Sequence, residues 1–141
     1  MVFEVRPLFG ALAICKASAM NNVIVWDLET VPDLRGFAVA NDMSASTDAE
    51  VLEAIGEKFP KHIYHSIVCI GALVPHREQG GWIVDALGAP HVGERTEKQL
   101  ITAFVDRIGE FSPQLVTFNG NGFELPVLRS CRVTRGGRQA L

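Results

Sequence analysis

The sequence predicts a single α/β domain with a mixed β-sheet flanked by helices. A length of 141 residues suits one hydrophobic core. Hydrophobic residues make up 48% of the chain and charged residues 21%, a balance typical of folded globular proteins. The periodicity gives the order strand, helix, strand pair, helix, strand, helix, which is the pattern of an α/β sheet.

Three regions of the sequence predict strands. Residues 23–28, VIVWDL, form a continuous apolar run, which is typical of a central strand buried on both faces. Residues 65–74 are rich in β-branched side chains and stop at Pro75, and the segment GGWIVDAL then predicts the second strand of an antiparallel hairpin. Residues 114–118, QLVTF, predict a short further strand.

Helices are predicted between and after these strands. The segment that follows the first strand, residues 30–47, has no sustained period, and we expect a loop with one helical turn. Thr47 or Asp48 then caps a short helix within 48–59. Apolar residues recur on one face of residues 94–111, so we expect an amphipathic helix that ends near Ser112 and Pro113.

Composition limits the classes of function. The net charge of −3 argues against a protein that coats nucleic acid through bulk charge, so any such contact must be local. Three widely separated cysteines, Cys15, Cys69 and Cys131, predict reduced, buried thiols in a cytoplasmic protein. No run approaches the roughly 18 apolar residues of a membrane helix. His62 and His65 lack partners at zinc-site spacing, and we expect both at the surface.

Two acidic residues at the end of the first apolar run are the first candidate for chemistry. Side chains two apart on a strand point the same way, so Asp27 and Glu29 would project from one face. Neighbouring carboxylates are unfavourable unless a cation neutralises them, and oxygen ligands suit Mg²⁺ or Mn²⁺. The alternative is that the strand has ended by Asp27 and both acids are solvated in a loop that leads to Pro32.

A second motif corroborates the pair. In FNGNGFELPVL, residues 118–128, the acid Glu124 follows a strand and a Gly-rich turn and begins a helix whose first turn holds Pro126. With VWDLETVPDL, this segment resembles the two first motifs of the DEDD superfamily of 3'-5' exonucleases. The resemblance is specifically to a family of predicted exonucleases similar to the proofreading domain of family B DNA polymerases, and it covers roughly residues 23–132.

The resemblance implies a ribonuclease H-like fold and a metal-dependent 3'-5' exonuclease that hydrolyses phosphodiester bonds at the 3' ends of single-stranded DNA or RNA. It implies that two Mg²⁺ or Mn²⁺ ions are bound by Asp27, Glu29 and Glu124, which are then the catalytic residues. It also implies that the substrate end is held by Thr30, Asn119, Gly120 and Phe123.

Two departures from the family pattern bear on activity. The family usually has Asp where this chain has Glu124, and its third motif would lie beyond Leu141. We therefore expect a ribonuclease H-like sheet that lacks its final strand and helix, with activity impaired by truncation. The predicted organisation is an N-terminal extension over 1–19, the incomplete exonuclease domain over 20–132 and a tail over 133–141. The alternative function is a non-catalytic nucleic-acid-binding remnant of such a domain.

Overall fold

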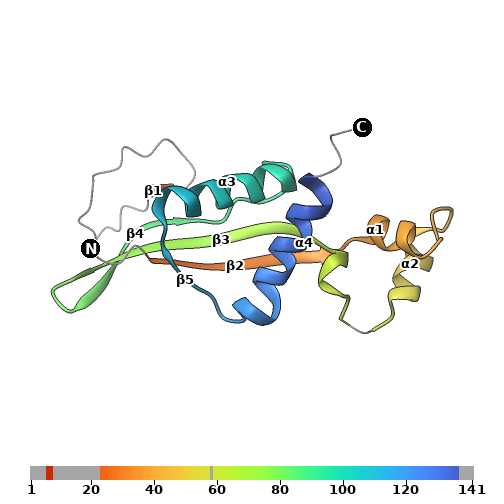
Figure 1. Ribbon diagram of the computed structural model, residues 1–141, viewed down its shortest axis with the longest axis horizontal. Helices are drawn as coiled ribbons and strands as arrows, with labels where there is room; N and C mark the ends of the chain where they lie inside the picture. Colours follow the sequence, from red (N-terminus) through yellow and green to blue (C-terminus); the bar gives the residue numbers. More distant parts are fainter. Residues whose placement is uncertain (1–5, 8–22, 58, 137–141) are drawn as a thin grey trace.

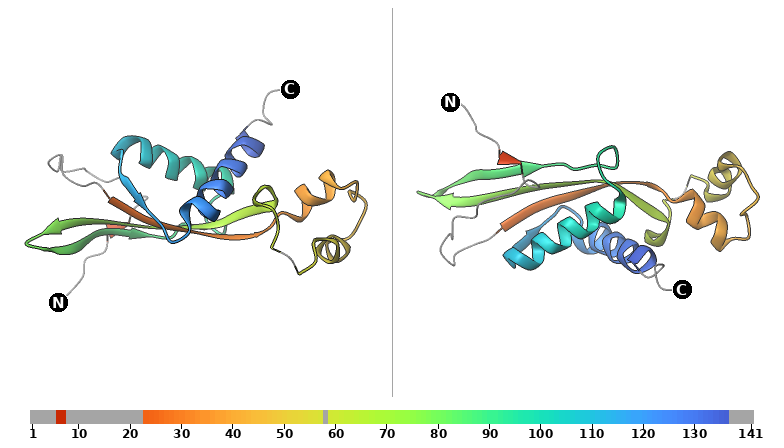
Figure 2. Two further views of the ribbon diagram at one scale, coloured as in Figure 1. Left: turned by 60° about the horizontal axis from the view of Figure 1, so that its bottom comes forward. Right: turned by 90° about the horizontal axis from the view of Figure 1, so that it is seen from above.

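A mixed five-stranded sheet forms the body of the protein, in the order β1-β4-β3-β2-β5 (Figure 1). The computed structural model describes residues 6–7, 23–57 and 59–136. Helices α3 and α4 lie on the same face of this sheet, while α1 and α2 lie beyond one of its ends (Figure 2). The predicted α/β class with a mixed sheet is therefore confirmed, and the arrangement is consistent with a ribonuclease H-like fold.

Strand β2, Val23–Pro32, is central to the sheet. It pairs antiparallel with β3, His65–Glu78, and parallel with β5, Gln114–Val116. The prediction that this strand is buried on both faces is wrong. Its buried and exposed residues alternate, because the described helices cover only one face of the sheet, so Trp26 is buried while Val25 is 39% exposed.

Strands β3 and β4, Gly81–Gly88, form the predicted antiparallel hairpin. Gln79 and Gly80 connect them with φ angles of 47° and 85°, the left-handed conformations that tight hairpin turns require. The predicted end of β3 at Pro75 is wrong. The strand continues because its register shifts between Val74 and Pro75, and such an irregularity accommodates a residue without a backbone N–H.

The outer edge of β4 pairs in parallel with β1, Arg6–Pro7. These two residues belong to the segment 1–19 that the sequence predicts to be an extension. The rest of that segment, including Cys15, lies outside the described residues, as does the end of the predicted tail after Gly136.

Two of the helices precede β3. Helix α1, Leu34–Ala40, is longer than the single turn expected in this loop, because the side chain of Asp33 caps it by accepting a hydrogen bond from the backbone N–H of Gly36. Helix α2, Asp48–Ile55, confirms the predicted helix there. Its cap is Thr47, in a reciprocal pair with Glu50.

Helix α3, Glu97–Phe111, confirms the predicted amphipathic helix. Together with α4, Leu125–Gly136, it encloses the core against β2 and β3. Phe104 of α3 lies 4.9 Å from Trp26, measured between ring centroids. Helix α4 has Pro126 in its first turn, as predicted, and it extends past residue 132. Among the described residues, no helix is long and apolar enough to cross a membrane.

Candidate functional site

Asp27 and Glu29 lie inside β2, where their cross-strand partners are Gly71 and Cys69 of β3. The alternative that both acids belong to a loop is therefore wrong, since the strand continues to Pro32. Both side chains are exposed, on the face that α3 and α4 leave uncovered. The backbone N–H of Leu28 donates to Oδ1 of Asp27 at 2.9 Å.

Cys69 lies opposite Glu29 and is half-buried. Burial raises the pKa of its thiol above the usual value, and the neighbouring Glu29 carboxylate adds to the effect. Cys131 of α4 is buried, and burial raises its pKa to about 11. Neither thiol forms a disulfide in this structure, and the prediction of burial holds for Cys131, whereas Cys69 is half-buried.

Glu124 ends η2, Gly120–Glu124, a single wide helical turn that leads into α4. Its side chain is only 3% exposed. Oε1 accepts a hydrogen bond from the backbone N–H of Asn119 at 3.3 Å, whereas Oε2 is buried with no hydrogen-bond partner. A buried carboxylate oxygen without a hydrogen-bond partner is costly, so this position favours a bound cation.

The three predicted metal ligands do not form one ready-made centre. Within residues 6–7, 23–57 and 59–136, no three His, Cys, Asp or Glu side chains are arranged to hold a metal ion. Asp27 and Glu29 still fit a magnesium or manganese ion as a pair, because such ions keep several waters and are often bound by one or two carboxylates together with substrate phosphates. Glu124 adds a buried carboxylate whose Oε2 is unpaired.

Two pockets border the segment between β5 and η2. The first, which we name the Asp27 pocket, has a volume of about 470 Å³, and its lining includes Val25, Asp27, Leu87, Val116 and Phe118. The second, the Asn119 pocket, has a volume of about 490 Å³, and its lining includes Trp26, Thr117, Phe118, Asn119 and Asn121. Asp27 and the motif that contains Asn119 therefore meet at Phe118, which borders both pockets.

The glycines of the motif are required by packing. A Cβ atom on Gly120 would collide with the side chain of Thr117, and one on Gly122 would collide with the side chain of Asn119. Backbone N–H groups of Gly122 and Phe123 both donate to the carbonyl oxygen of Asn119, at 3.0 and 2.8 Å. The loop is thus held close to the end of β5 by its own backbone.

Phe123 and Thr30 are linked through His65. The ring of Phe123 lies 5.2 Å from that of His65 and 5.3 Å from that of Phe59. Nδ1 of His65 lies 3.0 Å from Oγ1 of Thr30, and Nε2 lies 3.2 Å from the carbonyl oxygen of Pro60. Since a carbonyl only accepts, Nε2 carries the proton in the neutral ring, and the Thr30 hydroxyl then donates to Nδ1.

The prediction that His65 is a surface residue is wrong, since it is 4% exposed. Burial is tolerated because both ring nitrogens have partners and the ring packs between aromatic side chains. Its burial could have been predicted from its position at the start of a strand rich in β-branched residues. His62 is half-buried in η1, His62–Tyr64, with its ring 6.0 Å from that of Phe123.

We expect His65→Ala to lower the free energy of unfolding by about 2 kcal/mol, because it removes ring packing and leaves the Pro60 carbonyl without its donor. The matched variant His62→Ala should change it by only about 0.5 kcal/mol. Urea unfolding followed by circular dichroism measures both. Equal effects of the two substitutions would show that His65 does not organise the end of β2.

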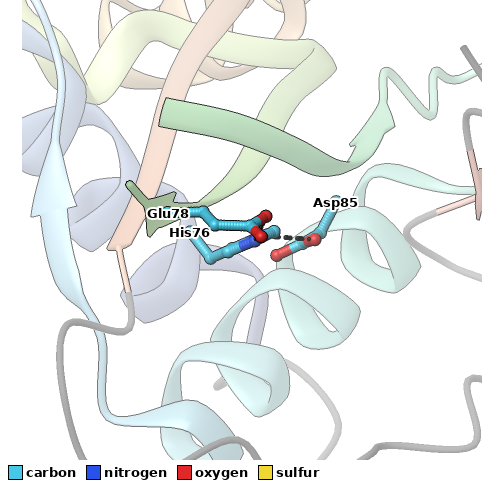
Figure 3. A network of polar contacts seen from close by, with 3 residues as sticks. All are labelled: His76, Glu78 and Asp85. Atoms are coloured by element: carbon cyan, nitrogen blue, oxygen red, sulfur yellow. Dashed lines mark hydrogen bonds and ion pairs between the residues drawn. The ribbon is translucent and has the colours of Figure 1, made fainter. Parts of the chain in front are cut away.

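A separate polar network lies on the β3–β4 hairpin (Figure 3). Nδ1 of His76 is 2.7 Å from Oδ1 of Asp85, and its Nε2 is 3.6 Å from Oε2 of Glu78. The sequence analysis did not identify this group. All three side chains are about half exposed, and polar pairs at the surface contribute little to stability. We therefore infer that these contacts help to fix the register in which β3 pairs with β4.

Comparison with known proteins identifies the family. Residues 57–139, more than half of the chain, match the model of a family described as predicted 3'-5' exonucleases related to the exonuclease domain of PolB. The match includes Glu124 and the motif around Asn119, and it begins after Asp27 and Glu29. A search of curated proteins found no match. The chain therefore belongs to the family of predicted 3'-5' exonucleases related to the PolB exonuclease domain.

Proposed function

We propose that this protein is a metal-dependent 3'-5' exonuclease that hydrolyses phosphodiester bonds at the 3' ends of single-stranded DNA or RNA. The observation that carries the proposal is that Asp27 lines the same pocket as Thr117 and Phe118, which lead into the motif matched by the exonuclease family. A carboxylate suited to a divalent ion thus lies beside the segment that the family match covers.

Asp27 and Glu29 are the proposed first ligands of Mg²⁺ or Mn²⁺, since both carboxylates project from one exposed strand face. Glu124 is the proposed third ligand, supported by its unpaired Oε2. Bound divalent ions would activate a water molecule and stabilise the leaving 3' oxygen. The free thiols of Cys69 and Cys131 support a cytoplasmic location, where such thiols stay reduced.

The proposed substrate-binding residues act from three positions. Asn119 and Gly120 line the Asn119 pocket, where an exposed amide and a close backbone approach suit the sugar and phosphate of a terminal nucleotide. Thr30 lies after Glu29 and is oriented by His65. Phe123 packs against His65. In this proposal Phe123 therefore supports the loop, while Asn119, Gly120 and Thr30 contact the nucleic-acid substrate.

The direct test uses a single-stranded oligonucleotide labelled at its 5' end. With Mn²⁺ or Mg²⁺ the protein should shorten the strand progressively from the 3' end and release nucleoside 5'-monophosphates, and EDTA should stop the reaction. A labelled product that appears at once as a mononucleotide would indicate 5'-3' degradation. Cleavage at internal positions would also contradict the proposal.

Glu124→Gln separates the catalytic role of Glu124 from its structural one. The amide oxygen can still accept the hydrogen bond from Asn119, whereas the negative charge is lost. We expect Mn²⁺-dependent activity to fall on the order of 100-fold, because a metal ligand has lost its charge. Thermal stability should be retained or increased, since an unpaired carboxylate oxygen is no longer buried.

The control for this substitution is Glu53→Gln, which changes an exposed carboxylate on α2 and should leave activity unchanged. Full activity in Glu124→Gln would exclude Glu124 as a ligand. Loss of both activity and folding would assign it to the structure of the loop alone.

A second candidate function is non-catalytic binding of single-stranded nucleic acid. It is favoured by the lack of a three-ligand metal cluster within the described part of the chain. This function predicts salt-sensitive binding of single strands without cleavage under any divalent metal. The degradation assay distinguishes the two, because only the exonuclease shortens the strand.

A further inference from the structure

Phe118 has an unusual position for a large apolar side chain. It is 102% exposed, at the point where the chain leaves β5 and turns into the motif loop. Other large apolar side chains of the uncovered sheet face are about half exposed, such as Val116 at 41%. A ring that makes so little contact with its own chain contributes nothing to the core, so it is available to contact a ligand.

Phe118 lies between a mostly apolar pocket and a more polar one. On one side lies the Asp27 pocket, whose lining is mostly apolar and includes the charged side chain of Asp27. On the other lies the Asn119 pocket, with the amides of Asn119 and Asn121 and the backbone of the Gly-rich turn. The strand register explains why Asp27 and Phe118 line one pocket: Val25 pairs with Val116, and Asp27 and Phe118 each follow two residues later along their segments.

We propose that Phe118 is a stacking platform for a nucleobase near the 3' end of a single-stranded substrate. This inference rests on the proposed exonuclease function and adds a residue that selects unpaired bases. Aromatic side chains stack on any base through its π-face, so they hold single strands with little regard to sequence. The site offers one group for each part of a nucleotide. The ring of Phe118 would stack on the base, the Asp27 carboxylate would bind the phosphate through a cation, and the amide-lined Asn119 pocket would hold the sugar.

A protein partner fits the same surface less well. Any partner that covered Phe118 tightly would also cover the Asp27 carboxylate, because both line one pocket. Desolvating an unpaired carboxylate is unfavourable, whereas a nucleotide brings a divalent cation with its phosphate. A second copy of the chain, which has the same carboxylate, would add a like charge to the interface.

The test compares two fluorescent oligonucleotides of one length, one with normal bases and one with abasic sites at its three terminal 3' positions. Binding is measured by anisotropy with Ca²⁺ in place of Mn²⁺. Wild-type protein should prefer the normal strand, and Phe118→Ala should bind that strand about tenfold more weakly. Phe118→Ala should bind the abasic strand as wild type does, and Phe118→Trp should restore binding of the normal strand.

Trp82→Ala is the matched control, since Trp82 is a 57% exposed aromatic residue on β4 that neither pocket includes. It should bind both strands as wild type does. Equal binding of the two strands by wild type, with cleavage intact, would overturn the stacking role and leave the exonuclease proposal standing.

Two other outcomes overturn the inference. If wild-type protein binds neither strand and cleaves neither, the proposed function fails and the stacking role fails with it. If Phe118→Ala alters only the mass measured by sedimentation, Phe118 packs against another copy of the chain and not against a base.

Discussion

Replacing Asp27 with Asn is expected to reduce Mn²⁺-dependent release of nucleotides by about three orders of magnitude, because the charge stabilisation that a bound metal ion supplies is worth several kcal/mol. The substitution keeps the shape of the side chain, and its oxygen can still accept the hydrogen bond from Leu28. Release of 3'-terminal nucleotides from a labelled strand measures the effect.

Asp106→Asn is the control for this prediction. Asp106 is an exposed acid on α3, so its substitution makes the same change of charge away from the pocket. Both variants should unfold at the temperature of the wild type, since neither side chain is buried. Retention of activity in Asp27→Asn would remove Asp27 from the reaction and with it the proposed metal pair.

Replacing Phe104 with Ala should lower the free energy of unfolding by about 3–5 kcal/mol, because it leaves a cavity between α3 and β2. Phe104 is 1% exposed and packs on Trp26 with ring centroids 4.9 Å apart. This is a large share of the stability of a small domain. Guanidinium unfolding, followed by circular dichroism, measures the loss.

Phe118→Ala provides the comparison, since it removes the same ring from an exposed position and should change stability by only about 0.5 kcal/mol. A similar loss in both variants would mean that Phe118 is buried in solution. A loss near zero in Phe104→Ala would contradict the position of the core between α3 and the sheet.

The fold class and most elements could be predicted from periodicity. A continuous apolar run and β-branching identify the strands, and the apolar face of 94–111 identifies α3. What periodicity does not reveal is which sheet face the helices cover. The run VIVWDL was predicted to be buried on both faces, yet Val25 faces away from the helices. Pro75 was predicted to end a strand, because a register shift leaves no mark in a single sequence.

The candidate site was predicted only as far as local geometry allows. A period of two residues suffices to place Asp27 and Glu29 on one face, and the structure has them there. The period of a strand does not predict which distant segments of the chain come into contact. The burial of His65 depends on Thr30 and Phe123, and the position of Phe118 beside Asp27 depends on the pairing of β5 with β2.

The central claim is that the Asp27 and Glu29 carboxylates hold a divalent ion together with a substrate phosphate, and Mn²⁺ binding measured by calorimetry tests it most directly. Wild-type protein should bind Mn²⁺ more tightly when a nucleoside 5'-monophosphate is present. Asp27→Asn should lose this binding, whereas Asp106→Asn should keep it. Equal Mn²⁺ affinity in wild type and Asp27→Asn would contradict the account.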